Sequence, residues 1–352
     1  MEVKGIRHEA FNCEKYVSGK SMEDVMADYG LTSVVKLGSN ENMYAPYNIA
    51  LNAMGEEVKK LNIYPEKNYI KLKKVVGEKF GVDGDWVSLG HGAGNVLDEV
   101  AKTLLEDGDE VLVPQQSYRL YREISKIMGA KVIEVPLNDN YTMELKDFKE
   151  KLTDKTKIVW ICNPNNPTGS VLTKEEVRKI VKSTDALIAL DEAYMEFGDE
   201  SLIDEVMDYD NLLIVKTVSK AFSLAGIRMG YIVANEDIIT SIEKVRAPYN
   251  LNSLSTYIAT EALRQKERMF DYIKKIKGER EKIYKALVDL GVKAYKSSAN
   301  FVFFKSDIDD LQKKLVDKDV LIRKFSGKLD GYYRVSIGTK EQNEKFLKAF
   351  KE

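Results

Sequence analysis

The sequence predicts an α/β protein in which a large, mostly parallel sheet is accompanied by a smaller α+β domain. Between residues 86 and 234, short apolar runs alternate with segments of helical periodicity, and strands separated by helices usually pair in parallel. Runs such as 186–190 are apolar at every position, which is typical of strands buried on both faces. From about residue 238, long charged helical segments replace this alternation, which indicates a second domain.

Chain length also favours more than one domain. The chain has 352 residues, of which 44% are hydrophobic and 31% charged, and this is more than one core usually holds. We expect residues 1–40 to form an N-terminal arm and part of the small domain. Residues 41–245 would form the large domain, and residues 246–352 the small C-terminal domain.

Composition argues against several classes of protein. The net charge of −2 provides no basic surface for nucleic acid. No apolar run approaches the ~20 residues of a membrane-spanning helix, and the N-terminus lacks the apolar core of a signal peptide. The two cysteines, Cys13 and Cys162, match no disulfide or metal pattern, and two histidines are too few for a histidine metal site. We therefore expect a cytoplasmic protein with reduced thiols, no metal and no membrane contact.

The individual elements follow from periodicity and from start and stop signals. Ser21 precedes acidic residues and is a candidate N-cap for the first helix, whereas Gly30 and Gly81 mark helix ends. The expected helices cover 22–29, 49–60, 69–80, 96–105, 120–128, 145–152, 174–183, 261–290 with a break near Gly278, 308–318 and 341–350. The expected strands cover 34–37, 86–89, 110–113, 131–135, 157–162, 186–190, 212–216, 229–234, 300–304, 320–322 and 333–336.

Five of these strands are followed by segments that can carry chemistry. Ligands of open parallel sheets bind beyond the carboxyl ends of the strands. The five segments are the glycine-rich turn 90–95, Ser117-Tyr118, the loop 163–169 with two prolines, Asp191 to Tyr194, and Thr217 to Lys220. Each alone is compatible with a turn, a cap, a core aromatic or a surface charge. Together they offer a phosphate cradle at a helix N-terminus, a ring-stacking aromatic, hydrogen-bond donors, a carboxylate and an amine.

Lys220 is the centre of this set. It follows the apolar run 211–215 and is surrounded by small and apolar residues, with Arg228 eight positions later. Desolvation favours the neutral amine of a lysine, and a neutral amine can attack a carbonyl to form a Schiff base. On this stretch alone, a loop lysine that faces water is an equally good interpretation.

Three motifs resemble fold type I pyridoxal-phosphate aminotransferases, and the resemblance extends over nearly the whole chain. They are Asn-Pro-Asn-Asn-Pro-Thr-Gly at 163–169, Asp-Glu-Ala-Tyr at 191–194, and Ser-Lys-Ala-Phe-Ser-Leu-Ala-Gly-Ile-Arg at 219–228. Four further segments, 16–20, 38–42, 64–65 and 333–339, look like the histidinol-phosphate aminotransferase branch. The resemblance implies a homodimer that uses pyridoxal 5'-phosphate and exchanges an amino group between histidinol phosphate and 2-oxoglutarate in a ping-pong cycle.

The resemblance also implies a role for each matching residue. Lys220 would bind the cofactor covalently and move a proton, and Asp191 would pair with the pyridine nitrogen. The other implied cofactor contacts are Asn166 and Tyr194 to the ring oxygen, Tyr118 to the ring face, and Ala93, Gly94, Asn95, Thr217, Ser219 and Arg228 to the phosphate. Tyr64 would reach the phosphate in the neighbouring subunit. Tyr16, Asn42, Arg323 and Arg334 would bind substrate, the two arginines gripping its anionic end.

Three departures from the family pattern keep other substrates open. They lie in 42–46, in the turn 91–95, where His91 precedes Gly-Ala-Gly-Asn, and in 115–119, where Arg119 follows the stacking tyrosine. His91 is an acid or base, or a hydrogen-bonded turn residue. The alternative functions are an aminotransferase for other, aromatic amino acids and a decarboxylase of the phosphothreonine type. A non-catalytic regulatory domain would normally carry an added DNA-binding segment, for which we see no basic extension.

Overall fold

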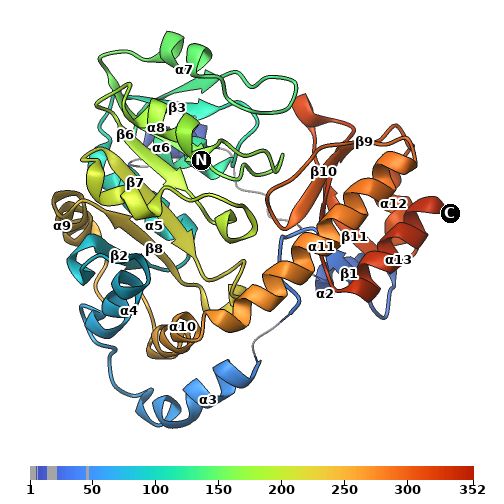
Figure 1. Ribbon diagram of the computed structural model, residues 1–352, viewed down its shortest axis with the longest axis horizontal. Helices are drawn as coiled ribbons and strands as arrows, with labels where there is room; N and C mark the ends of the chain where they lie inside the picture. Colours follow the sequence, from blue (N-terminus) through green and yellow to red (C-terminus); the bar gives the residue numbers. More distant parts are fainter. Residues whose placement is uncertain (1–4, 6, 14–21, 45–46) are drawn as a thin grey trace.

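The computed structural model describes residues 5, 7–13, 22–44 and 47–352. Two sheets, one of seven strands and one of five, organise these residues, and helices pack around both (Figure 1). The predicted fold class is confirmed, since the larger sheet is mostly parallel and the smaller one is built with helices into an α+β unit.

The larger sheet has the order β2-β8-β7-β6-β5-β3-β4. Its strands are β2 (Val87–Gly90), β3 (Glu110–Pro114), β4 (Lys131–Val135), β5 (Thr156–Cys162), β6 (Leu187–Asp191), β7 (Leu212–Thr217) and β8 (Gly230–Ala234). The strands β7, β6, β5, β3 and β4 run parallel, whereas β8 runs antiparallel to both β2 and β7. Because β2 and β7 are both antiparallel to β8, β2 points the same way as these five strands. The carboxyl ends of all six strands therefore lie at one edge of the sheet.

Both faces of this sheet are covered, as the uninterrupted apolar runs predict. Alternate strand residues point to opposite faces, so Leu112 and Ile188 join one core while Val111 and Ala189 join the other. The first core includes residues of α4 (Ile70–Phe80), α7 (Leu145–Lys151), α8 (Lys174–Val181) and α10 (Ser253–Arg264). The second core includes residues of α5 (Ala93–Leu104), α6 (Leu120–Ile127) and α9 (Glu236–Val245).

The smaller sheet joins the two ends of the chain. Its order is β1-β11-β12-β10-β9, with β1 (Val35–Leu37), β9 (Lys293–Ala294), β10 (Phe301–Lys305), β11 (Val320–Lys324) and β12 (Tyr332–Ser336). β1 runs parallel to β11, with Val35 opposite Val320. The helices nearest the chain ends are α1 (His8–Asn12), α2 (Met22–Tyr29), α3 (Tyr47–Glu57), α12 (Leu311–Val316) and α13 (Lys340–Lys351). The domain boundaries given above remain a prediction.

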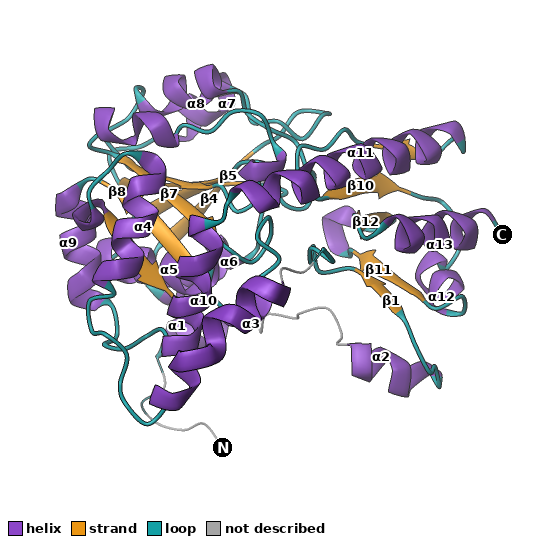
Figure 2. Cartoon of the chain, turned by 60° about the horizontal axis from the view of Figure 1, so that its bottom comes forward, coloured by secondary structure: helices purple, strands orange, loops and turns teal. Residues whose placement is uncertain are grey.

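The long helix expected over 261–290 is instead two helices, and the expected break near Gly278 is wrong. α10 ends at Arg264, and α11 (Glu267–Asp289) continues without interruption through Gly278. A glycine inside a helix costs about 1 kcal/mol relative to alanine, but Ile276 and Ile283 bury side chains on either side of it. α11 contacts the 3-10 helix η3 (Met195–Phe197) beside the larger sheet and β10 and α13 around the smaller one (Figures 1 and 2).

The sequence prediction missed the short α1, the two-residue β9 and two longer helices, α9 and all but the last turn of α10. Both helices begin with an asparagine cap, because Asn235 accepts a hydrogen bond from the Asp237 N–H and Asn252 from the Ser255 N–H. The remaining 3-10 helices are η1 (Val58–Lys60), η2 (Gly84–Trp86), η4 (Ile203–Asp208), η5 (Ala225–Ile227) and η6 (Gly327–Leu329). In the described part of the chain, no helix is long and apolar enough to span a membrane, and no cluster of metal-binding side chains is found.

Candidate active site

The candidate site lies where the parallel strands of the larger sheet end and the smaller sheet begins. Asp191 is the last residue of β6, and Lys220 comes three residues after the end of β7. Because β6 and β7 are neighbouring parallel strands, both residues reach the same edge of the sheet. Arg334, on β12 of the smaller sheet, contacts the loop after β5. The site is therefore built from both sheets.

Lys220 is half-buried, and its surroundings lower its affinity for a proton. Its Nζ donates a hydrogen bond to the Ser39 carbonyl at 3.2 Å and lies 5.7 Å from the centre of the Tyr194 ring. Burial, together with the positive charges of Arg334 and Arg228, lowers the pKa of Lys220 to about 8, although Glu41 and Asp191 act in the opposite direction. A substantial fraction of the amine is consequently neutral at mildly alkaline pH, the form that acts as a nucleophile.

Asp191 is buried, with 3% of its surface exposed. The Tyr121 hydroxyl donates to its Oδ2 at 2.7 Å, and the Ala193 N–H donates to its Oδ1 at 3.0 Å. Burial raises the pKa of this carboxyl group, and the two donors only partly oppose that effect. Asp191 is thus a fixed carboxylate in a poorly solvated place, where a cationic ligand group would be held strongly.

Tyr121 is a site residue that the sequence analysis missed. It lies on α6, and its ring stacks on Trp160 with centres 5.5 Å apart and an interplanar angle of 5°. The ring of Tyr118 meets Tyr121 edge-on, with centres also 5.5 Å apart. In sequence, Tyr121 has the helical spacing of a core aromatic, so only the structure reveals that its hydroxyl reaches Asp191.

A turn and a helix N-terminus form a second part of the site. Ala93, Gly94 and Asn95 open α5, and the preceding residue, Gly92, caps the helix without a side-chain hydrogen bond. A Cβ on Gly92, which has φ 80°, would lie 2.5 Å from a terminal nitrogen of Arg228, and a Cβ on Gly230 would lie 2.5 Å from the Ala93 nitrogen. The two glycines therefore keep the guanidinium and the first helical N–H groups accessible to an anion.

Thr217 and Ser219 lie beside this turn. Thr217 Oγ1 donates to the Met229 carbonyl at 2.9 Å and lies 2.9 Å from Ser219 Oγ. Both residues are buried, whereas Arg228 is exposed and donates to the Ala225 carbonyl at 3.1 Å. Two hydroxyls, one guanidinium and a helix N-terminus thus converge, which is a suitable donor set for a phosphate group.

Arg334 links the smaller sheet to the larger one. One terminal nitrogen donates to Asn166 Oδ1 and the other donates to the Gly38 carbonyl at 2.9 Å. Its guanidinium carbon lies 5.1 Å from the centre of the Phe301 ring. Arg334 and Asn166 are therefore together, although 168 positions separate them in the sequence.

Asn40 is another site residue that the sequence analysis did not single out. Its side-chain amide donates to the Tyr194 hydroxyl at 3.1 Å, and burial raises the pKa of that tyrosine. Asn40 itself is held by Ser336, whose hydroxyl accepts from the Asn40 N–H at 2.8 Å. The sequence analysis singled out Asn42 in this segment, and nothing in the sequence indicated that Asn40 also faces the site.

Of the other predicted site residues, Tyr64 lies on the surface, whereas Asn42 contacts the backbone beside Lys220. Tyr64 is 80% exposed and stacks on Tyr249, with ring centres 4.8 Å apart. The side-chain amide of Asn42 donates to the Ala221 carbonyl at 3.1 Å, and its oxygen accepts from the Tyr44 N–H at 3.0 Å. Asn42 thus holds the backbone next to Lys220. Tyr16 lies outside the described residues.

Three further residues lie at the margin of the site. Arg323 is opposite Arg334 in the pairing of β11 with β12, and its guanidinium carbon lies 6.0 Å from the centre of the Phe325 ring. Arg119 forms an ion pair with Glu123 at 3.3 Å. The side chain of His91 is exposed, and its backbone N–H donates to Asn95 Oδ1 at 2.8 Å.

Comparisons with known proteins agree with this architecture. The family model described as "Aminotransferase class I and II" matches residues 32–350. The histidinol-phosphate aminotransferase of Brevibacillus brevis is 33% identical, over 98% of this chain and 97% of that protein. The crystal structure of the histidinol-phosphate aminotransferase from Clostridium acetobutylicum is 30% identical, with a TM-score of 0.83 over 90% of this chain and 98% of the other.

A further solved structure supports the fold alone, because it is only 21% identical. It is the histidinol-phosphate aminotransferase from Sinorhizobium meliloti in complex with pyridoxal-5'-phosphate, which has a TM-score of 0.89. It covers 99% of this chain, and this chain covers 97% of it.

Proposed function

Because this chain belongs to the class I and II aminotransferase family, whose members use pyridoxal 5'-phosphate, we propose that it transfers the amino group of histidinol phosphate to 2-oxoglutarate. For the reaction type, the observation that carries the proposal is a lysine with its pKa lowered to about 8 beside a buried carboxylate at the carboxyl edge of the sheet. For the substrate, support comes from relatives named histidinol-phosphate aminotransferase, which this chain matches over nearly their whole length.

The donor set fits the cofactor. Lys220 provides the amine for covalent attachment, and Asp191 provides a carboxylate for the ring nitrogen. The first N–H groups of α5, the hydroxyls of Thr217 and Ser219 and the guanidinium of Arg228 are the proposed phosphate ligands. Gly92 and Gly230 support this assignment, because a Cβ at either position would fill the cradle. Tyr118 is proposed to cover the ring, and Asn166 and Tyr194 to donate to its oxygen.

When bound, pyridoxal phosphate supplies an electron sink for the bond that breaks at the substrate carbon carrying the amino group. Asp191, oriented by Tyr121 and the Ala193 N–H, holds a proton on the ring nitrogen. Lys220 Nζ accepts the proton that leaves the substrate carbon and returns it later in the cycle. A pKa of about 8 suits this exchange, because both protonation states are accessible near neutral pH.

Arg334 is the proposed anchor for the anionic end of the substrate. A guanidinium fork pairs well with a phosphate or carboxylate, and Arg334 is fixed by Asn166 and Gly38 at the junction of the two sheets. Arg323, its neighbour across the β11–β12 pair, Asn42 and Tyr16 are proposed to complete substrate binding. The assignments of Arg334, Arg323 and Asn42 rest on the resemblance and on this placement, and that of Tyr16 rests on the resemblance alone.

We propose a homodimer as the active unit. Tyr64 lies in a segment with several exposed apolar side chains, including Leu51 at 66%, Leu61 at 56% and Ile63 at 62% exposed. A patch of this kind is typical of a surface covered by a partner. In the dimer, Tyr64 would reach the phosphate in the neighbouring subunit.

A screen of amino donors tests the proposed function. The holoenzyme is mixed with histidinol phosphate, glutamate, aromatic amino acids or phosphothreonine, and the absorbance change of the bound cofactor is followed. We expect histidinol phosphate to react with the highest kcat/KM among the non-glutamate donors. A higher value for an aromatic amino acid, or release of CO2 from phosphothreonine, would replace the proposed substrate by one of the alternatives.

A further inference from the structure

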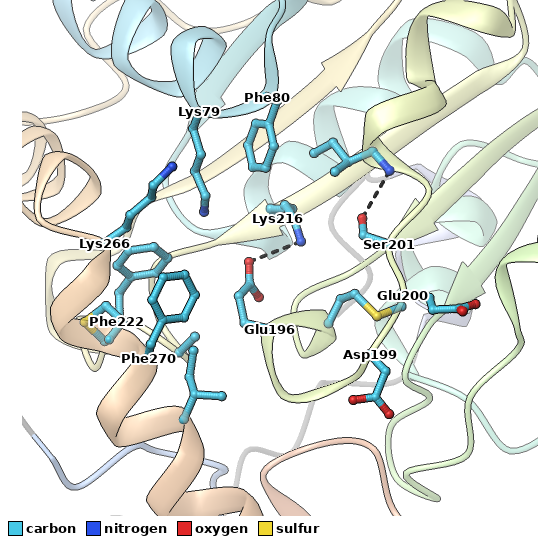
Figure 3. Close-up of a pocket in the computed structure, with 15 residues that line it drawn as sticks. Lys79, Phe80, Glu196, Asp199, Glu200, Ser201, Lys216, Phe222, Lys266 and Phe270 are labelled. Atoms are coloured by element: carbon cyan, nitrogen blue, oxygen red, sulfur yellow. Dashed lines mark hydrogen bonds and ion pairs between the residues drawn. The ribbon is translucent and has the colours of Figure 1, made fainter.

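A cavity of about 220 Å³ lies behind the segment that carries Lys220. Its wall comes from the end of α4, residues 195–203, β7, residues 221–222 and the first two turns of α11 (Figure 3). Lys220 itself does not line this cavity. The cavity therefore contacts Lys216 and Ala221, which lie before and after Lys220 in the sequence, but is separate from the site described above.

Most charged groups at this cavity already have partners. The buried Lys216 lies 3.1 Å from both Glu192 and Glu196. Asp199 pairs with Lys277 at 2.8 Å. Glu196 and Asp199 thus each form an ion pair with a lysine other than Lys79.

Lys79 differs from these groups. Within the described ranges, no side chain or carbonyl offers its ammonium a hydrogen bond or an ion pair; its nitrogen instead lies 4.9 Å from the centre of the Phe80 ring and 4.8 Å from that of Phe222. Burial lowers the pKa of Lys79 to about 8, so the ammonium form still predominates at pH 7. Glu196 attracts the ammonium electrostatically from beyond ion-pair distance. A half-buried cation that faces a cavity and has aromatic rings as its direct contacts favours an anionic ligand.

The rest of the wall defines the body of such a ligand. Lys266, at the start of α11, lines the same cavity and supplies a second positive charge (Figure 3). Phe80, Phe222 and Phe270, with Met195 and Met269, provide an apolar lining. Small-molecule sites commonly combine an apolar wall with a few charged groups that orient the ligand.

We propose that this cavity binds a small organic monocarboxylate, with its carboxylate at Lys79 and Lys266 and its apolar body against Phe80, Phe222 and Phe270. The proposal does not depend on the substrate assigned to the Lys220 site. A ligand in this cavity would contact Ala221 and Phe222, which directly follow Lys220. It would also contact α11, a helix that itself packs against η3, β9 and β10.

Octanoate is a suitable probe, because it has one carboxylate and an apolar chain. Isothermal titration of the holoenzyme, saturated with 2-oxoglutarate, should give one octanoate per chain. Lys79→Met removes the charge but keeps a long side chain, and we expect it to weaken binding at least tenfold. Lys74→Met is the matched control, since Lys74 lies on the same helix with a largely exposed side chain, and should leave binding unchanged.

A protection experiment on the unmodified protein makes the test independent of variant folding. Octanoate should slow acetylation of Lys79, measured by peptide mass spectrometry, severalfold and leave that of Lys74 unchanged, whereas octan-1-ol should protect neither. The proposal is overturned if octanoate shows no saturable binding, if Lys79→Met and Lys74→Met bind it equally, if 2-oxoglutarate displaces it, or if Lys79 is not protected.

Discussion

The protonation of Lys220 depends on a few identifiable neighbours. Burial makes the largest contribution to its lowered pKa, and the charge of Arg334 the next largest. Arg334 therefore has two proposed roles, since it would also hold the anionic end of the substrate. This coupling means that a change at Arg334 should alter the amine as well as the binding of substrate.

The first prediction concerns the pH at which Lys220 becomes reactive. In the protein freed of cofactor, the rate of Lys220 acetylation should rise with pH around a midpoint near 8, because the neutral amine is the reacting form. The free ε-amine of an Nα-acetyl-lysine standard in the same mixture should have its midpoint near pH 10.4. Arg334→Gln removes a positive charge and should move the Lys220 midpoint upward. Equal midpoints for Lys220 and the standard would contradict the described environment.

The second prediction separates charge from geometry at Arg334. Arg334→Ala should raise KM for the phosphorylated substrate by roughly 10- to 100-fold, since a hydrogen bond to a charged group contributes about 1.5–3 kcal/mol. Arg334→Lys should recover part of this loss, because the charge remains while the fork is lost. Steady-state kinetics with histidinol phosphate measures both effects. An unchanged KM in Arg334→Ala would remove this residue from the substrate site.

At the scale of elements, apolar runs predicted the strands of the larger sheet well. Such runs are specified locally, because strands such as β6, β7 and β8 are buried along their whole length. Strand direction was harder to predict. β8 has the same kind of apolar run as its neighbours, yet it lies antiparallel between β2 and β7. Its direction depends on how residues 218–229 turn, with Ser223 and Arg228 both at positive φ. The absence of an expected helix between residues 216 and 229 is the one sequence feature that is compatible with an antiparallel connection.

The helices show where local signals mislead. Gly278 suggested a break, but packing on both sides keeps α11 continuous. For the site itself, motifs at strand ends predicted the residues now found near Lys220. They did not predict Tyr121 or Asn40, because these side chains reach the site through tertiary packing.

The third prediction concerns Gly278. It is exposed within α11, has no positive φ, and a Cβ there would meet no atom within 4 Å. Gly278→Ala should therefore raise the free energy of unfolding by about 0.5–1 kcal/mol, measured by urea denaturation. Gly81→Ala is the matched control: it also has open space, but its φ of 71° is strained for alanine, and it should be destabilising. Destabilisation by Gly278→Ala would show that α11 is not a regular helix there.

At the scale of the whole molecule, the candidate site depends on contacts between distant parts of the chain. β1 pairs with β11, and the loop after β1 supplies the Gly38 and Ser39 carbonyls that accept from Arg334 and Lys220. The N-terminal segment thus connects the smaller sheet to the amine on the larger one. Pairing between segments so far apart in sequence leaves no local pattern, which is why the sequence alone did not predict these contacts.

The fourth prediction tests the proposed dimer. Ile63 is 62% exposed and lies next to Tyr64, so Ile63→Asp should weaken association by placing a charge on an apolar interface. Light scattering after size-exclusion chromatography should show a dimer for the unmodified protein and a shift towards monomer, with loss of activity, for the variant. Val288→Asp, at an exposed position on α11, should remain dimeric. A monomeric, active unmodified protein would contradict the proposal.

The central claim is that Lys220 holds the cofactor covalently, and one measurement tests it most directly. The holoenzyme is reduced with borohydride, digested, and analysed by mass spectrometry for the lysine that carries the pyridoxyl group. The account predicts a single modified residue, Lys220, and no modification of Lys216 or Lys79, which lie at the separate cavity. A pyridoxyl group on any other lysine, or on none, would contradict it.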